Sequence, residues 1–325
     1  MAPMLRWGGG IALALIAALG GLLLLFTYQQ ARSLIRATHK PLEKRPANVG
    51  LTVEELRIPG PRGMLSAWYL PATNGCTLIC CHGVYDNKGQ WLDQIARLHA
   101  TSGYGALAFD FGAHGESDGA VVTFGVRERD DVAAVVAYLR GRGDVNMAAL
   151  GILGYSLGAI TAILAAAMLP ELRVVVIESG FSDLQRDISE LFTRFTHMPA
   201  FPFANLVVFW GERIAHVKLG DIRPEQVIGQ ISPRPILIIS DLNDTLAIEP
   251  EDGERLYAAA GEPKELWQVV DVGHVQAFAL LPDEWLTRVG GFLDRYLAPL
   301  GQQQGEQAPS IPATVSTATP APADV

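Results

Sequence analysis

The stretch LGILGYSLGAITAILAA, residues 150–166, decides the fold of this 325-residue chain. At its centre the pentapeptide GYSLG, residues 154–158, matches the pattern G-x-S-x-G. An apolar run of strand length precedes the pentapeptide, and small apolar residues of helical length follow it. A serine on a tight strand-to-helix turn is the setting of a catalytic nucleophile, because a helix N-terminus lies beside its hydroxyl. The stretch therefore predicts that Ser156 is a nucleophile and that the Leu157 N–H binds the oxyanion.

A serine hydroxyl needs a general base near neutral pH, and the chain has seven histidines. His274 is the candidate base because it lies in VVDVGHVQAF, a loop directly after the last expected strand. A carboxylate between the serine and this histidine should orient the imidazole. Asp244, in the loop after the apolar run PILIIS, is the preferred carboxylate, and Asp241 at the end of that run is the second choice. Asp271 and Glu178 are further, less favourable positions.

The loop CCHGVYDNKGQW, residues 80–91, is the expected source of a second oxyanion donor, because it follows the third strand. Gly83 lets the backbone approach the substrate closely, so the N–H of Val84 is the predicted donor. His82 is interpreted as a residue that orders this loop and not as the general base. Tyr85 and Asp86 are expected at the entrance of the site.

Apolar runs of strand length alternate with helical patterns over residues 49–300, which predicts one α/β domain. Continuous apolar runs such as CTLICCHG indicate strands that are buried on both faces. Amphipathic stretches such as GQWLDQIARLHATSG indicate the helices between these strands. The predicted architecture is a mostly parallel sheet with helices on both faces.

One interval, about residues 180–232, interrupts this alternation because it contains no clear strand. Seven aromatic residues lie within it, and we expect a short helical lid between two strands of the sheet. Its aromatic side chains either pack against one another or form an apolar roof over a substrate cleft. The sequence alone leaves both interpretations open.

Residues 8–28 carry no charge and are numerous enough to cross a bilayer as a helix. A cleaved signal peptide would have a shorter apolar region, so we predict an uncleaved transmembrane anchor preceded by the flank 1–7. Residues 29–48 form a basic linker to the domain. Because this linker is more basic than the flank, the domain is expected on the cytoplasmic side of the membrane.

The C-terminal residues 301–325 are rich in Gln, Pro, Ala and Thr and lack apolar periodicity, which predicts a disordered tail. The net charge of −9 argues against a nucleic-acid partner. The three cysteines, Cys76, Cys80 and Cys81, lie in one apolar run and are interpreted as buried free thiols. No Cys or His spacing resembles a zinc site, and no metal or organic cofactor is expected.

Together these motifs resemble the α/β-hydrolase superfamily over about residues 52–296. CHGV is similar to the His-Gly oxyanion loop of that family, and FDFGAHGESDG is similar to its D-x-R-G-x-G-x-S-x-G loop. GYSLG, the loop at Asp244 and the Gly-His pair at residues 273–274 follow in the family order. The lid and the stretch GERLYAAA resemble the Bem46/ABHD13-like or serine-aminopeptidase-like branch. The resemblance implies an eight-stranded α/β-hydrolase fold and serine hydrolase activity, in a branch with some membrane-anchored members.

The sequence therefore predicts a membrane-anchored serine hydrolase that cleaves carboxylic esters, with small-molecule ester or acyl substrates. Its catalytic residues would be Ser156, His274 and Asp244, and its oxyanion donors the N–H groups of Val84 and Leu157. The anchor and the aromatic lid suggest lipid-like acyl groups.

Two other readings use the same fold. A peptidase or acyltransferase could employ the same three catalytic residues. An exopeptidase would also need an acidic group that binds the substrate amine, and Glu190 and Glu212 of the lid are candidates for this group. A non-catalytic binding module is the third possibility. The ordered serine, aspartate and histidine argue against it, because a scaffold needs none of them.

Overall fold

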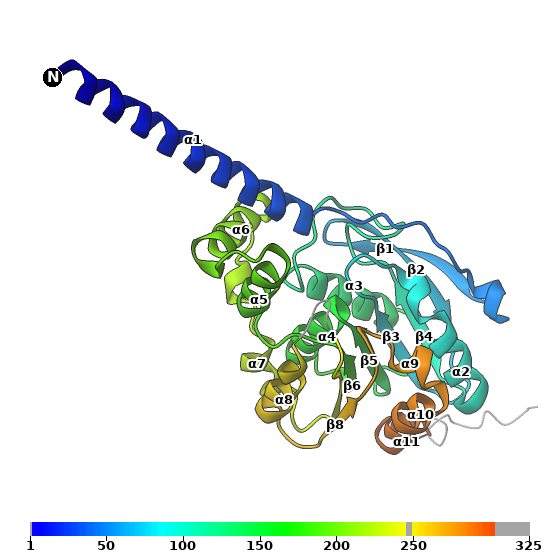
Figure 1. The fold of residues 1–325 in the computed structure, drawn as a ribbon. Helices are drawn as coiled ribbons and strands as arrows, with labels where there is room; N and C mark the ends of the chain where they lie inside the picture. The colour runs from blue at the N-terminus through cyan, green and yellow to red at the C-terminus, as the bar shows by residue number, and fades with distance from the viewer. Residues whose placement is uncertain (1, 245–248, 303–325) are drawn as a thin grey trace, which may run out of the picture.

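The computed structural model describes residues 2–244 and 249–302 of the chain. Its centre is one eight-stranded sheet in the order β1-β2-β4-β3-β5-β6-β7-β8 (Figure 1). β1 pairs with β2 and β2 with β4 in antiparallel orientation, whereas all other neighbours are parallel. The strands are β1 Glu54–Gly60, β2 Gly63–Leu70, β3 Thr77–Cys81, β4 Gly105–Phe109, β5 Leu150–Tyr155, β6 Leu172–Glu178, β7 Ile236–Asp241 and β8 Lys264–Val269. The predicted fold class, a mostly parallel eight-stranded sheet, is confirmed.

Both faces of the sheet are covered by helices, so the central strands are buried on both sides. On β3, Ile79 and Cys81 pack in one hydrophobic cluster with α3 and α4, while Leu78 and Cys80 pack in a second cluster with α2 and α11. This alternation points Cys80 and Cys81 to opposite faces of the sheet, and all three cysteines are buried and free. The helices of the domain outside the lid are α2 Leu92–Ser102, α3 Glu128–Arg140, α4 Leu157–Met168, α8 Pro250–Ala259, α9 Ala277–Leu280, α10 Pro282–Trp285, α11 Gly291–Tyr296 and α12 Ala298–Gln302.

The outer strand β1 is the one strand that the apolar pattern does not indicate. Its more buried residues Leu56, Ile58 and Gly60 alternate with exposed ones, but only two of them are large apolar residues, so the apolar alternation in the sequence is short. It forms because its backbone pairs with β2 along its whole length, from Glu54 opposite Tyr69 to Gly60 opposite Gly63.

Residues 180–232 contain helices and no strand. Two helices, α5 Leu184–Thr196 and α6 Ala200–Ala215, pack against each other at one side of the domain (Figure 1). The short helix α7 Pro224–Val227 follows them in the chain. Phe192 of α5 stacks on Phe203 of α6 with ring centroids 6.1 Å apart. Phe195 and Phe201 are instead exposed, Phe201 to 78%. The lid therefore buries some of its aromatic side chains internally and presents others on its surface.

The N-terminal helix α1, Ala2–Leu34, is one continuous helix that projects from the domain (Figure 1). It runs six residues beyond Tyr28, so the first part of the segment interpreted as a linker is helical. Its stretch Leu13–Leu34 is long and apolar enough to cross a membrane, and only 6% of its most apolar part is buried in the domain. A signal sequence has the same length and apolar character. The predicted disordered tail lies outside the described residues, apart from the end of α12.

The last turns of α1 pack against the lid and are not a flexible tether. The Tyr28 ring meets Trp210 of α6 edge-on at 5.7 Å, and Phe26 meets Phe192 of α5 at 6.4 Å. Ala31 is fully buried in the same apolar cluster. The position of α1 is therefore fixed relative to the two lid helices.

A buried ion pair fastens the loops that follow β3 and β4. Lys88 and Asp110 are both fully buried, with Nζ 2.7 Å from Oδ2. The backbone N–H of Lys88 donates to the other oxygen of Asp110, also at 2.7 Å. Nζ donates in addition to Ser66 and Glu116. Because every polar group of this pair has a partner, the geometry is that in which a buried ion pair is tolerated, and it holds the loop of residues 82–91 in place.

Candidate active site

Ser156 lies on a strained turn between β5 and α4. Its backbone has φ 52° and ψ −113°, a conformation that residues with a side chain rarely adopt and that costs on the order of 1–3 kcal/mol. Its N–H donates to the carbonyl oxygen of Glu178 on β6, at 3.0 Å, which ties the turn to the neighbouring strand. The hydroxyl-bearing side chain is thereby presented at the carboxyl end of the sheet, where the loops after the parallel strands meet.

The two glycines of the pentapeptide are required by contact distances. A Cβ atom on Gly154 would lie 2.2 Å from the carbonyl oxygen of Gly158, and one on Gly158 would lie 2.1 Å from that of Cys81. Both distances are far below any van der Waals contact, and the opposing atoms belong to backbone that cannot swing aside. A side chain at either position would therefore disrupt the turn that carries Ser156.

His274 and Asp244 meet in the loops after β8 and β7. Nδ1 of His274 is 2.5 Å from Oδ2 of Asp244. The Asp244 side chain is almost completely buried, whereas the imidazole is one-fifth exposed. Because Nδ1 faces a carboxylate, it carries the proton, which leaves Nε2 of the neutral ring as an acceptor. This is the tautomer that a general base needs.

Asp241, the second choice for the acidic residue, has different hydrogen-bond partners. Its Oδ2 accepts hydrogen bonds from the N–H of Val275, at 2.9 Å, and from the hydroxyl of Ser179, at 2.6 Å. Glu178 accepts in the same way from the N–H of Ala277, at 3.1 Å. These two carboxyl groups hold the backbone that follows His274. Burial raises the pKa of Asp241 to about 6 and raises that of Glu178 well above its usual range.

The two predicted oxyanion donors lie beside Ser156. Val84 and Leu157 line the same cavity as the serine. Leu157 is the first residue of α4, so its N–H has no partner within the helix. The N–H of Val84 forms no hydrogen bond to the described part of the chain. The adjoining Gly83 packs closely on the nucleophile, since a Cβ there would be 3.6 Å from Cβ of Ser156.

His82 orders the oxyanion loop, as the sequence suggested. It is fully buried, with Nδ1 2.7 Å from the carbonyl oxygen of Gly83, while Nε2 accepts a hydrogen bond from the N–H of Phe111 at 3.1 Å. Burial lowers the pKa of His82, so the ring is neutral and joins the loop after β3 to the loop after β4.

The cavity above Ser156 has a volume of about 380 Å³ and is mainly apolar. Lid residues of α5 and α6 form one wall, and Val84, Tyr85 and Phe124 contribute to another. Gln30 and Leu34 of α1 complete the lining. The contribution of α1 was not visible in the sequence, because more than 120 residues separate these two side chains from the serine and no local pattern connects them.

Asp187 of α5 is the acidic side chain in the described lining of this cavity. It is 4% exposed, and burial, followed by the nearby carboxylate of Asp252, raises its pKa to about 9. It therefore keeps its proton at neutral pH. Glu190 and Glu212, the candidates for binding a substrate amine, are not among the described residues that line the cavity, and Glu212 accepts a hydrogen bond from the N–H of Gly220.

The described residues contain no group of three or more His, Cys, Asp or Glu side chains that could hold a metal ion. The groups that the site offers for chemistry are the Ser156 hydroxyl, the His274–Asp244 pair and the N–H groups of Val84 and Leu157. An eight-stranded, mostly parallel sheet that presents a strained serine on the turn after β5 is the α/β-hydrolase fold, and this arrangement defines the class of serine hydrolases.

Comparisons of the sequence agree with this class. The model of the X-Pro dipeptidyl-peptidase (S15) family matches residues 30–204, and that of the prolyl oligopeptidase family matches residues 120–298. The chain belongs to the α/β-hydrolase superfamily, which includes both families. The Bem46/ABHD13-like or serine-aminopeptidase-like branch stays a prediction.

Individual relatives cover most of the domain. The uncharacterized protein YqkD of Bacillus subtilis is 26% identical over 222 residues, 67% of this chain and 71% of YqkD. The uncharacterized protein Rv2307c of Mycobacterium tuberculosis is 27% identical over 268 residues, 80% of this chain and 86% of its own length. Among solved structures, an esterase of Pyrococcus furiosus superimposes with a TM-score of 0.65 at 26% identity, covering 78% of this chain and 95% of the esterase.

Mutation can distinguish the contributions of Asp244 and Asp241 to catalysis. Asp244→Asn should lower kcat by about 10⁴-fold, because an amide favours the wrong imidazole tautomer. Asp241→Asn keeps an acceptor oxygen for the Val275 N–H and should lower kcat by less than about 10²-fold. Steady-state hydrolysis of a p-nitrophenyl ester by both variants is the measurement. A larger loss for Asp241→Asn would assign the catalytic carboxylate to Asp241.

The protonated state of Asp187 has a signature in the pH dependence of stability. Its pKa is about 9 in the folded chain, above the ordinary value, so the stability it contributes is present at low pH and lost as pH rises through 9. Asp187→Asn has no such titration. The free energy of unfolding of the variant minus that of the wild type should therefore increase by up to about 1.4 kcal/mol per pH unit between pH 4 and 9.

Urea unfolding in detergent micelles at acidic, neutral and alkaline pH measures this difference. Asp283→Asn, which changes a highly exposed aspartate of α10, is the matched control. Its free energy of unfolding should change with pH in the same way as that of the wild type. If the free energies of unfolding of Asp187→Asn and the wild type differ by the same amount at every pH in this range, Asp187 is ionised in the folded chain.

Proposed function

We propose that this protein is a membrane-anchored serine hydrolase that cleaves carboxylic esters through Ser156, His274 and Asp244. The observation that carries the proposal is the contact of 2.5 Å between His274 and Asp244, at the end of the sheet where Ser156 occupies its strained turn. The class of serine hydrolase rests on the fold and the family matches, and the assignment of these three residues goes beyond them.

The proposed reaction has two halves. Oγ of Ser156 attacks the ester carbonyl carbon and passes its proton to Nε2 of His274, while Asp244 stabilises the imidazolium. The N–H groups of Leu157 and Val84 hold the negative oxygen of the tetrahedral intermediate. The bond to the alcohol then breaks, and the alcohol oxygen takes the proton from His274.

An acyl group is left on Ser156 after this step. Water attacks its carbonyl carbon and gives a proton to His274, a second tetrahedral intermediate forms, and the bond to Oγ breaks as the proton returns to the serine. The products are the alcohol and the carboxylic acid. The apolar cavity of about 380 Å³ beside the serine fits an acyl group better than a charged one.

A peptidase that uses the same residues is the alternative, and both matched families are peptidase families by their descriptions. An aminopeptidase would need an anionic group near the serine for the substrate ammonium. Asp187 is the acidic side chain in the described lining, and its raised pKa keeps it neutral. For this reason we favour ester substrates.

The membrane part of the proposal rests on α1. Its apolar stretch is long enough to span a bilayer, and few of its residues are buried in the domain. Five basic residues lie within the segment 29–48, four of them after the end of α1, and under the positive-inside rule they favour the cytoplasmic side for the domain.

Ser156→Ala should abolish labelling of the full chain by a fluorophosphonate probe, because the probe reacts with an activated serine. Ser189→Ala is the matched control, since the Ser189 hydroxyl only donates to the carbonyl of Gln185 within α5. Gel fluorescence of membrane fractions that express each variant is the measurement. Labelling that persists in Ser156→Ala would refute this nucleophile.

Substrate class can be tested with p-nitrophenyl esters of increasing acyl length. We expect kcat/KM to rise by up to about fourfold per methylene until the cavity is full, as the burial of each CH₂ allows. Alanine p-nitroanilide is the comparison substrate. A higher kcat/KM for the anilide than for every ester would favour the peptidase alternative.

A further inference from the structure

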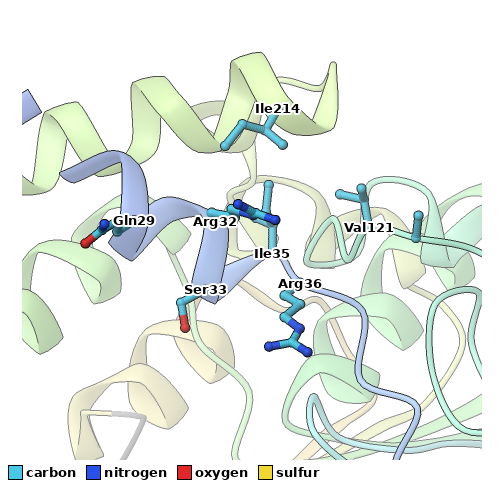
Figure 2. Close-up of a pocket in the computed structure, with 8 residues that line it drawn as sticks. Gln29, Arg32, Ser33, Ile35, Arg36, Val121 and Ile214 are labelled. Atoms are coloured by element: carbon cyan, nitrogen blue, oxygen red, sulfur yellow. The ribbon is translucent and has the colours of Figure 1, made fainter. Parts of the chain in front are cut away.

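A second cavity, of about 640 Å³, lies at the domain end of α1 and is separate from the one that contains Ser156. Gln29, Arg32, Ser33 and Arg36 line it from the end of the helix and the residues just after it. Figure 2 shows the Arg32 side chain on the last turn of α1 and the Arg36 side chain on the segment just after it, with Ile214 of α6 and Val121 on other sides of the cavity. We call this cavity the arginine groove.

The two arginines have no counter-charge in the described structure. No acidic side chain lines the arginine groove, and neither Arg32 nor Arg36 forms an ion pair with any described residue. The other three cations of the basic segment do have carboxylate partners: Lys40 pairs with Asp86, Lys44 with Asp93 and Arg45 with Glu116. The unpaired positive charge is therefore concentrated in the groove.

The backbone that carries Arg36 is held against the domain. Arg36 forms a β-bridge with Val121, and the N–H of Val122 donates to the carbonyl oxygen of Ile35 at 3.0 Å. Arg32 and Arg36 are both exposed, and their like charges repel each other. An anion that binds both guanidinium groups would relieve this repulsion.

The position along α1 indicates where that anion would come from. Arg32 follows Tyr28, the end of the uncharged stretch, by four residues, which is about 6 Å along a helix. The polar layer on each side of the hydrocarbon core of a bilayer is on the order of 5–8 Å thick. If α1 spans the membrane to Tyr28, the guanidinium groups lie at the level of the lipid phosphates.

We propose that the arginine groove binds the phosphate of an anionic phospholipid from the bilayer that α1 crosses. Guanidinium groups bind phosphate through paired N–H donors, and Gln29 and Ser33 add hydrogen-bonding groups beside them. Val121 and Ile214 provide apolar contact for the glycerol and acyl portion. This inference rests on the membrane anchoring in the proposed function and is independent of the ester chemistry.

Native mass spectrometry of the full chain in detergent, with equal amounts of dioleoyl-phosphatidylglycerol and dioleoyl-phosphatidylcholine, tests the proposal. We expect retention of phosphatidylglycerol in preference to phosphatidylcholine. The double variant Arg32→Gln, Arg36→Gln should bind phosphatidylglycerol about 30-fold more weakly, since each juxtamembrane arginine contributes roughly a factor of 5. The matched control Lys44→Gln, Arg45→Gln removes the same charge from the same segment and should retain the preference.

Two further measurements test whether charge and lipid account for the result. Arg32→Lys, Arg36→Lys keeps the charge and should retain most of the preference, so that a loss seen only in the glutamine variant reports on charge and not on folding. Inorganic phosphate in excess should not displace the lipid, whereas displacement would mean that the groove binds free phosphate and that the lipid assignment is wrong.

Equal binding of the two lipids, or an equal loss in the Lys44→Gln, Arg45→Gln control, would overturn the arginine groove as a lipid site. Membrane anchoring is checked separately by alkaline carbonate extraction. Release of the full chain would overturn both the anchor and the groove, while membrane retention without a lipid preference would overturn the groove alone.

Discussion

The backbone conformation at Ser156 is the constraint on which the rest of the site depends. Its positive φ is unfavourable, and the turn is possible only because Gly154 and Gly158 let two backbone segments approach to distances that any side chain would block. The hydrogen bond to β6 and the close contact of Gly158 with β3 embed this turn in the centre of the sheet. A strained residue persists where the surrounding structure holds it this firmly.

Around that turn, the parallel strands bring together groups that are distant in the chain. β7 and β8 are parallel neighbours that end at the same edge of the sheet, so Asp244 and His274 meet although they are 30 residues apart in the chain. Asp241 and Glu178 add a second layer, because they bind the backbone that follows His274 and so fix where its ring can lie. The site is therefore built from strand ends and not from any one motif.

The anchor helix, the lid and the substrate cavity form one connected structure. α1 packs on α5 and α6 through Phe26, Tyr28 and Ala31, and its Leu34 lines the cavity above the serine. In the proposed function, the segment that holds the protein at the membrane also shapes the space for the acyl group. The arginine groove lies on a neighbouring face of the same helix end, which would place a lipid phosphate and a lipid-like substrate within one region of the protein.

The sequence by itself determined the α/β class, the strand–turn–helix at Ser156 and the order serine, aspartate, histidine, because periodicity and glycine placement are local properties. It left Asp241 and Asp244 open, since residues three apart in one loop differ only in which partner they reach. It also did not indicate Asp187 in the cavity, β1 at the sheet edge or the part of α1 in the lining. Only the tertiary structure showed which of the two aspartates contacts His274 and where Asp187, β1 and α1 lie, because each depends on packing or backbone pairing between segments whose contact no local pattern encodes.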